Sequence, residues 1–157
     1  RAKVEHRSRQ IDAHEARGYH GRSRSSTRWR DWQFGDDGRG LMKVVRIYTG
    51  DDGESHFEDL DLPYEKIADA EVTAQQTATG ISFRRTPPGN FVDWHPAPRR
   101  QYVITLEGQS EIGIGDGTKR IFNTGDVLLA DDLSGRGHTT AVHGDSPRVS
   151  IAIPLVD

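Results

Sequence analysis

The feature that most constrains the fold of this chain is the alternation, from Met42 onward, between short apolar runs and turn residues. Runs rich in β-branched and aromatic residues are separated by Gly, Asp and Pro, which is the pattern of strands in a sandwich or barrel. Gly115-Asp116-Gly117 predicts a tight hairpin, because an Asp-Gly pair tolerates the positive φ values of such a turn. Only Pro63–Ala70 suggests a short helical turn. We therefore expect an all-β domain, with strands at residues 43–48, 55–61, 79–87, 101–107, 110–114, 119–122, 126–131, 137–143 and 148–154.

Length and composition narrow the class of protein. The 157 residues suit one ordinary domain, and 33% hydrophobic with 29% charged residues suits a soluble globular protein. No apolar run is long enough to cross a membrane, and the beginning lacks a charged and then apolar leader. We therefore expect a cytoplasmic protein with no membrane contact. The chain has no cysteine, so any metal must be bound by nitrogen or oxygen.

The first 41 residues differ from the remainder in charge and in pattern. They hold 10 Lys and Arg against 6 Asp and Glu, and they show no sustained apolar period. Such a segment buries too little surface to offset its ordering entropy, so we expect a disordered or non-native basic extension before a domain at residues 42–157. Its arginines, with Trp29 and Trp32 for stacking, suggest nucleic-acid contact as an alternative. The intermixed acidic residues and the lack of a motif argue against nucleic acid.

Two segments of the predicted domain carry a motif. The first reads GNFVDWHPAPRRQYVITLEG from Gly89, and the second reads GDVLLADDLSGRGH from Gly125. The first resembles the opening motif of the cupin family, in which a Gly precedes His-x-His, a Glu and a second Gly at fixed spacings. His95 stands at the first His, Ala97 at the second and Gln101 at the Glu. The second segment resembles the second cupin motif, with His138 at its histidine.

The resemblance implies a single double-stranded β-helix, the cupin jelly-roll barrel, with its site at the open mouth. It also implies one divalent transition metal (Fe, Mn, Ni or Zn), for which His95, Gln101 and His138 are the candidate ligands. The change at the Glu position removes a negative charge and weakens such a site. Asp93, two residues before His95 on an extended segment, would restore a set of two His and one carboxylate. His143 is a further candidate ligand. It lies five residues after His138, so an unbroken strand would turn the two side chains to opposite faces, which argues against their binding one metal ion together.

Polar side chains on the predicted strands suggest what the mouth binds. Four arginines lie on or beside strands that line the barrel, and arginine forks suit carboxylate or phosphate, so we expect an anionic small molecule. Solvated edge charges or salt bridges of a homodimer are the alternative for these arginines. Gly135 and Gly137 beside His138 would permit close approach of a ligand. The candidate ligand-binding residues are Arg84, Arg99, Tyr102 and Thr140, although alternation turns Tyr102 away from the inward face of Gln101.

Two functions are compatible with these residues. The first is a cupin-domain protein that binds a small molecule in the barrel mouth as a metal-dependent enzyme of the oxygenase, isomerase or lyase type. The second is a metal-free binding or sensing module without catalysis. No Gly-rich phosphate loop or Ser-His-Asp pattern is present in the sequence. We also expect a homodimer formed through an exposed sheet.

Overall fold

The computed structural model describes residues 44–156, all of which belong to one compact unit of the chain. The basic extension predicted at residues 1–41 lies outside these residues, so both its disorder and the domain boundary at Met42 stay predictions. Residues 44–156 form strands and turns without a helix, and thus offer no helix that would span a membrane.

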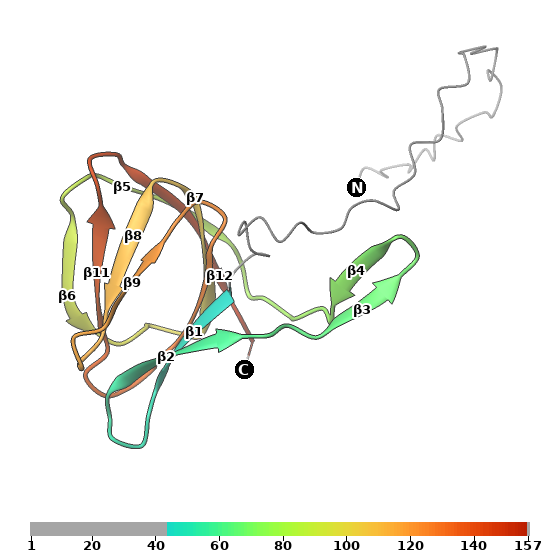
Figure 1. Ribbon diagram of the computed structural model, residues 1–157, viewed down its shortest axis with the longest axis horizontal. Helices are drawn as coiled ribbons and strands as arrows, with labels where there is room; N and C mark the ends of the chain where they lie inside the picture. The colour runs from blue at the N-terminus through green and yellow to red at the C-terminus, as the bar shows by residue number, and fades with distance from the viewer. Residues whose placement is uncertain (1–43, 157) are drawn as a thin grey trace, which may run out of the picture. The chain divides into compact units, whose positions relative to one another are not determined.

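The strands are arranged in two large sheets and one small hairpin (Figure 1). The larger sheet has six strands, in the order β2 (Ser55–Leu60), β1 (Val44–Thr49), β10 (Val127–Asp131), β7 (Gln101–Glu107), β12 (Arg148–Pro154) and β5 (Ser82–Thr86). The second has four, in the order β6 (Phe91–His95), β11 (His138–His143), β8 (Gln109–Gly113) and β9 (Lys119–Phe122). The hairpin consists of β3 (Tyr64–Ile67) and β4 (Ala70–Thr73).

The order of the strands is that of a jelly roll. From β5 to β12 the chain passes back and forth between the two sheets, and only the β8–β9 hairpin stays within one of them. This gives two facing layers, β5-β12-β7-β10 and β6-β11-β8-β9, while β1 extends the first layer by pairing parallel with β10. Two four-stranded layers with such crossings define the double-stranded barrel. The predicted all-β fold class is confirmed.

Strand alternation places the core between the layers. On β7 the side chains of Gln101, Val103 and Thr105 are buried, whereas Tyr102 and Ile104 are only half-buried on the other side. Val103 packs in one cluster with inward residues of the facing and neighbouring strands. The apolar members of this cluster include Ile47, Ile112, Phe122, Leu128 and Ala152. The core therefore fills the closed part of the barrel and leaves the side of the exposed strands β5 and β6 open.

Two local predictions were wrong. Residues 64–73 form the β3–β4 hairpin instead of a helical turn, with Ile67 opposite Ala70 and a positive φ of 53° at Ala68 in the connection. The i, i+3 spacing of Tyr64 and Ile67 imitates a helix, but it lies in a segment with no buried face. Strand β6 was not among the strands predicted from the sequence. It is an exposed edge strand that pairs only with β11, so apolar alternation does not mark it.

Candidate functional site

A cavity of about 180 Å³ lies between the two layers, within the open side of the barrel. Its walls are partly apolar, with Val92, Val103, Ile112 and Leu128, and its polar wall groups come from both layers. The polar groups that concern function are His95, Gln101, His138, Thr140, Arg84 and Arg148. Five of the residues predicted for metal or ligand binding therefore line this cavity, namely His95, Gln101, His138, Thr140 and Arg84.

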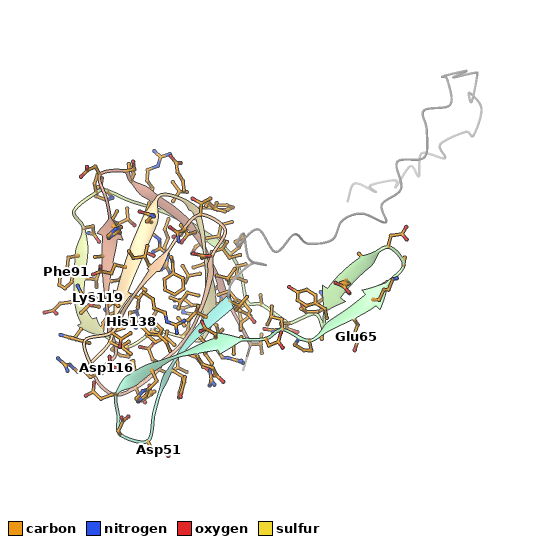
Figure 2. All side chains as sticks on the ribbon, viewed as in Figure 1. Asp51, Glu65, Phe91, Asp116, Lys119 and His138 are labelled. Carbon is orange, nitrogen blue, oxygen red and sulfur yellow. The ribbon has the colours of Figure 1, made fainter. Side chains whose placement is uncertain are left out.

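His138, which is labelled in Figure 2, is the first residue of strand β11. Its ring is held by the buried carboxylate of Asp132. Its Nδ1 lies 2.6 Å from Oδ2 of Asp132, and the same oxygen accepts a hydrogen bond of 2.8 Å from the hydroxyl of Ser55. Asp132 has no exposed surface, and His138 retains 5% of its own. The carboxylate accepts a hydrogen bond from Nδ1–H of His138. Nε2 is therefore the ring nitrogen that remains available to the cavity.

His95 is the last residue of strand β6 and lies beside His138 of the neighbouring strand β11. The two residues are paired in register, and their ring centroids lie 4.5 Å apart at an interplanar angle of 52°. Nδ1 of His95 is 2.7 Å from the backbone oxygen of Asp93, which fixes Nδ1 as the donor in the same way. Two neighbouring imidazoles on the cavity wall therefore both present Nε2 as their unused nitrogen.

An irregularity in β6 decides which of its side chains face the cavity. Between the pairs His138 with His95 and Thr140 with Val92, β6 has one residue more than β11. Such a bulge breaks strict alternation, so Val92 and His95 both line the cavity. Asp93 is exposed, and its Oδ1 accepts the N–H of Trp94. The set of Asp93, His95 and His138 expected from i, i+2 spacing is therefore not formed.

Gly137 permits a close approach, but of protein backbone and not of a ligand. It has a positive φ of 76°, and a Cβ at this position would overlap the carbonyl group of His95. Gly135, also at positive φ, lies in the same way against the backbone of Gly53. These glycines therefore let the loop before β11 pack against its neighbours, and Gly137 brings His95 and His138 together.

The other two motif positions differ in what they reach. Gln101 is 4% exposed and lines the cavity from β7. Ala97 belongs to the hydrophobic core cluster, and its N–H donates to the backbone oxygen of Asp132 at 2.9 Å. Among residues 44–156, no three His, Cys, Asp or Glu side chains are grouped so as to hold a metal ion. Two imidazoles and one neutral amide do not fit a tight divalent site, because no anionic ligand offsets the loss of water from the ion.

Arg84 and Arg148 supply positive charge to the cavity wall. Arg148, at the start of β12, is 9% exposed, and its Nη2 donates to Oγ1 of Thr105 at 3.3 Å. Burial, and to a lesser extent the charge of Arg84, lowers the pKa of Arg148 to about 10, so the group remains cationic at neutral pH. Arg148 was not among the ligand-binding residues predicted from the sequence. Alternation along β12 was the available signal, because it turns Arg148 inward together with Ser150 and Ala152.

The remaining candidate residues lie elsewhere. Arg99 lines an adjoining depression of about 310 Å³, and Arg84, Pro98 and Gln101 line both this depression and the cavity. Tyr102 is on the outer face of β7, between Leu129 and Ile153, and lines neither space. Strand alternation turns Tyr102 to the face opposite that of Gln101, although the two residues are adjacent in the chain. Tyr102 is therefore removed from the candidate ligand contacts. Arg100 is likewise directed to Asp131, with 3.5 Å between Nε and Oδ1.

Comparisons with known proteins identify structural similarity only. No family model matches the chain, and no curated protein matches it. A cupin-like protein from Thermotoga maritima is 24% identical, covers 48% of this chain and 55% of its own, and has a TM-score of 0.41. A Cupin 2 conserved barrel domain protein from Salinispora arenicola is also 24% identical, with 48% and 61% covered and a TM-score of 0.40. A cupin superfamily protein from Desulfitobacterium hafniense is 24% identical, with 54% and 73% covered and a TM-score of 0.41.

The matched segments leave much of each protein outside the comparison. The chain spans 55% and 61% of the length of the first two structures. The fold assignment therefore rests on the strand order of this chain, and the site is argued from its own residues.

Proposed function

We propose that this chain binds a small molecule in the cavity between the two layers of its cupin-type barrel. The observation that carries the proposal is the pair of imidazoles, His95 and His138, whose Nδ1 atoms are both occupied by protein oxygens. A fixed Nδ1–H leaves Nε2 as a hydrogen-bond acceptor for a ligand hydroxyl or N–H group. Gln101 adds an amide that both donates and accepts, so the polar wall suits a hydrogen-bonding ligand.

The donor set favours a metal-free site over a metal-dependent enzyme. Asp132, the carboxylate nearest to the imidazoles, is bonded to Nδ1 of His138 and Oγ of Ser55. It orients His138 without contributing an oxygen to the cavity wall. This supports the binding or sensing module, and the metal-dependent reaction is the weaker alternative.

Proton transfer is a second candidate function, favoured by the same buried carboxylate. A carboxylate at Nδ1 stabilises the imidazolium that forms when Nε2 takes a proton from a ligand. His138 would then act as a general base, and Asp132 would hold the orientation of its ring. The reaction class would be abstraction or relocation of a proton on the bound molecule.

Binding is tested by thermal-shift screening of the EDTA-treated protein against small hydroxylated and carboxylated compounds. We expect hits that raise the Tm of the wild type, with loss of the effect in His138→Ala. His143→Ala is the matched control, because His143 lies on the same strand but is exposed. Compounds that stabilise wild type and His138→Ala equally would contradict the proposal. Hits that all require added Fe, Mn, Ni or Zn would favour the metal-dependent enzyme instead.

A further inference from the structure

The cavity wall is positively charged at one place. Arg84 lies on β5 and Arg148 on the neighbouring strand β12, with Ser150 opposite Arg84 and Thr86 opposite Arg148. Both arginines are therefore diagonal neighbours whose side chains turn to the same inward side. Among the described residues that line the cavity, none is an Asp or Glu. Two guanidinium groups thus share one small space without an acidic partner on its wall.

Arg148 is the unusual member of this pair. Its side chain is more than nine-tenths buried, and within residues 44–156 its Nε has no hydrogen-bond partner. The hydroxyl of Thr105 accepts a hydrogen bond from one of the five N–H groups of the guanidinium, and no carboxylate of the described residues forms an ion pair with it. A buried charge without a counterion is costly, because water has been removed and nothing replaces it. The positive charge of Arg84 repels that of Arg148 and adds to this cost.

We infer that the cavity binds a small organic carboxylate, whose oxygens accept hydrogen bonds from Arg148 and Arg84. The guanidinium fork matches a carboxylate in a bidentate arrangement, and the hydroxyls of Thr86 and Ser150 lie beside it on the same wall. A space of about 180 Å³ suits a short acid. The apolar side chains of Val103 and Leu128 give its carbon chain a contact surface. The inference rests on the proposed function, since it identifies the ligand class of the same cavity.

The anion contact is separated from the histidine wall along the fold. Thr105, next to Arg148, is four residues from Gln101 on β7, which corresponds to about 13 Å between their Cα atoms. We therefore assign the carboxylate of a short acid to the arginine end of the cavity, with its carbon chain directed toward Gln101.

The inference is tested by thermal shift and calorimetry with sodium butyrate and sodium 2-hydroxybutyrate. Sodium chloride at the same ionic strength and sodium phosphate are the comparison anions. At tenfold excess over Kd, we expect a carboxylate to raise Tm by roughly 3 to 8 °C. Chloride should have no comparable effect. Arg148→Met and Arg84→Met should each weaken butyrate binding by about tenfold or more.

Arg85→Met is the matched control, since Arg85 follows Arg84 on β5 but pairs with Val149 on the outward side and lines no part of the cavity. It should bind butyrate like the wild type. Arg84→Met keeps the test valid if Arg148→Met fails to fold, because Arg84 is exposed.

Each alternative result is decisive. Stabilisation by phosphate and not by either carboxylate would overturn the assignment, as would carboxylate binding that survives both substitutions. If neither carboxylate binds while neutral hits from the screen still depend on His138, the inference fails and the proposed function stands. If no hit of any kind depends on His138, and carboxylates still bind through Arg148, the proposed role of the imidazoles fails alone.

Discussion

Oδ2 of Asp132 lies 2.6 Å from Nδ1 of His138, and both residues are buried. The two residues are six positions apart in the chain, on either side of the loop that contains Gly135 and Gly137. The relationship fixes the orientation of an imidazole that the cupin-like motif identifies only as a possible metal ligand. It also gives a role to Asp132, which lies within the second motif segment without being one of its ligand positions and is among the most buried polar residues.

Asp132→Ala should lower the free energy of unfolding by about 2 to 4 kcal/mol, because it leaves the donors of Ser55 and His138 unsatisfied in a buried site. Urea denaturation measures this change. Asp93→Ala is the control, since Asp93 is exposed and accepts only the N–H of Trp94. It should change stability by less than about 0.5 kcal/mol. Equal effects of the two substitutions would show that the Asp132 pair does not contribute to the fold.

Gly137→Ala should destabilise the protein by about 2 kcal/mol or more, for two reasons. The added methyl group would overlap the backbone of His95, and residue 137 would have to keep a left-handed conformation that alanine disfavours. Gly53→Ala separates the two causes. Gly53 has nearly the same φ, 77° against 76°, but its Cβ would meet nothing within 4 Å. It should cost only about 1 kcal/mol, the backbone contribution alone. Thermal or urea denaturation of both variants provides the comparison.

Gln101→Glu should strengthen the binding of divalent metal ions in the cavity. The substitution adds one carboxylate to the two imidazoles of His95 and His138, which completes a set of two His and one carboxylate. We expect Zn²⁺ or Ni²⁺ to bind the variant on the order of tenfold or more tightly than the wild type by isothermal calorimetry. Adding His138→Ala should remove the gain. Tight binding of these ions by the wild type would contradict our interpretation of the donor set.

Arg148→Met should raise the stability of the unliganded protein by about 1 to 3 kcal/mol. An unbranched apolar side chain of similar length replaces a buried charge that has no carboxylate partner. Arg85→Met, on the outward side of β5, should leave stability within about 0.5 kcal/mol of the wild type. Urea denaturation without added anions measures both. A loss of stability in Arg148→Met would mean that the guanidinium already has sufficient partners in the folded protein.

His56 should titrate above its ordinary value of 6.5, because Nε2 lies 3.0 Å from a carboxylate oxygen of Asp52 and this hydrogen bond raises its pKa. The same hydrogen bond lowers the pKa of Asp52. The His56 contribution to stability is therefore complete below pH 6.5 and is lost as pH rises through the raised pKa. The Asp52 contribution is lost as pH falls through the lowered one. NMR titration should show the His56 pKa returning toward 6.5 in Asp52→Asn, and an unchanged pKa would contradict the assignment.

Much of the strand pattern could be predicted because its signals are local. The runs around Gln101–Glu107 and Arg148–Pro154 end at turn residues and alternate, and both form strands at the predicted bounds. The motif spacing also identified His95, Gln101 and His138, which line one cavity. Strand β6 was missed, because an edge strand with exposed side chains has no apolar face to alternate.

The sequence by itself determined an all-β chain, the turn positions and which residues of a regular strand face inward, because these depend on the nearest neighbours along the chain. Only the tertiary structure decided what those inward residues meet. The bulge in β6 turns Asp93 out, the loop at Gly137 brings Asp132 under His138, and the pairing of β5 with β12 places Arg84 beside Arg148. Strand pairing and bulges set these contacts, and the strands that pair are far apart in the sequence.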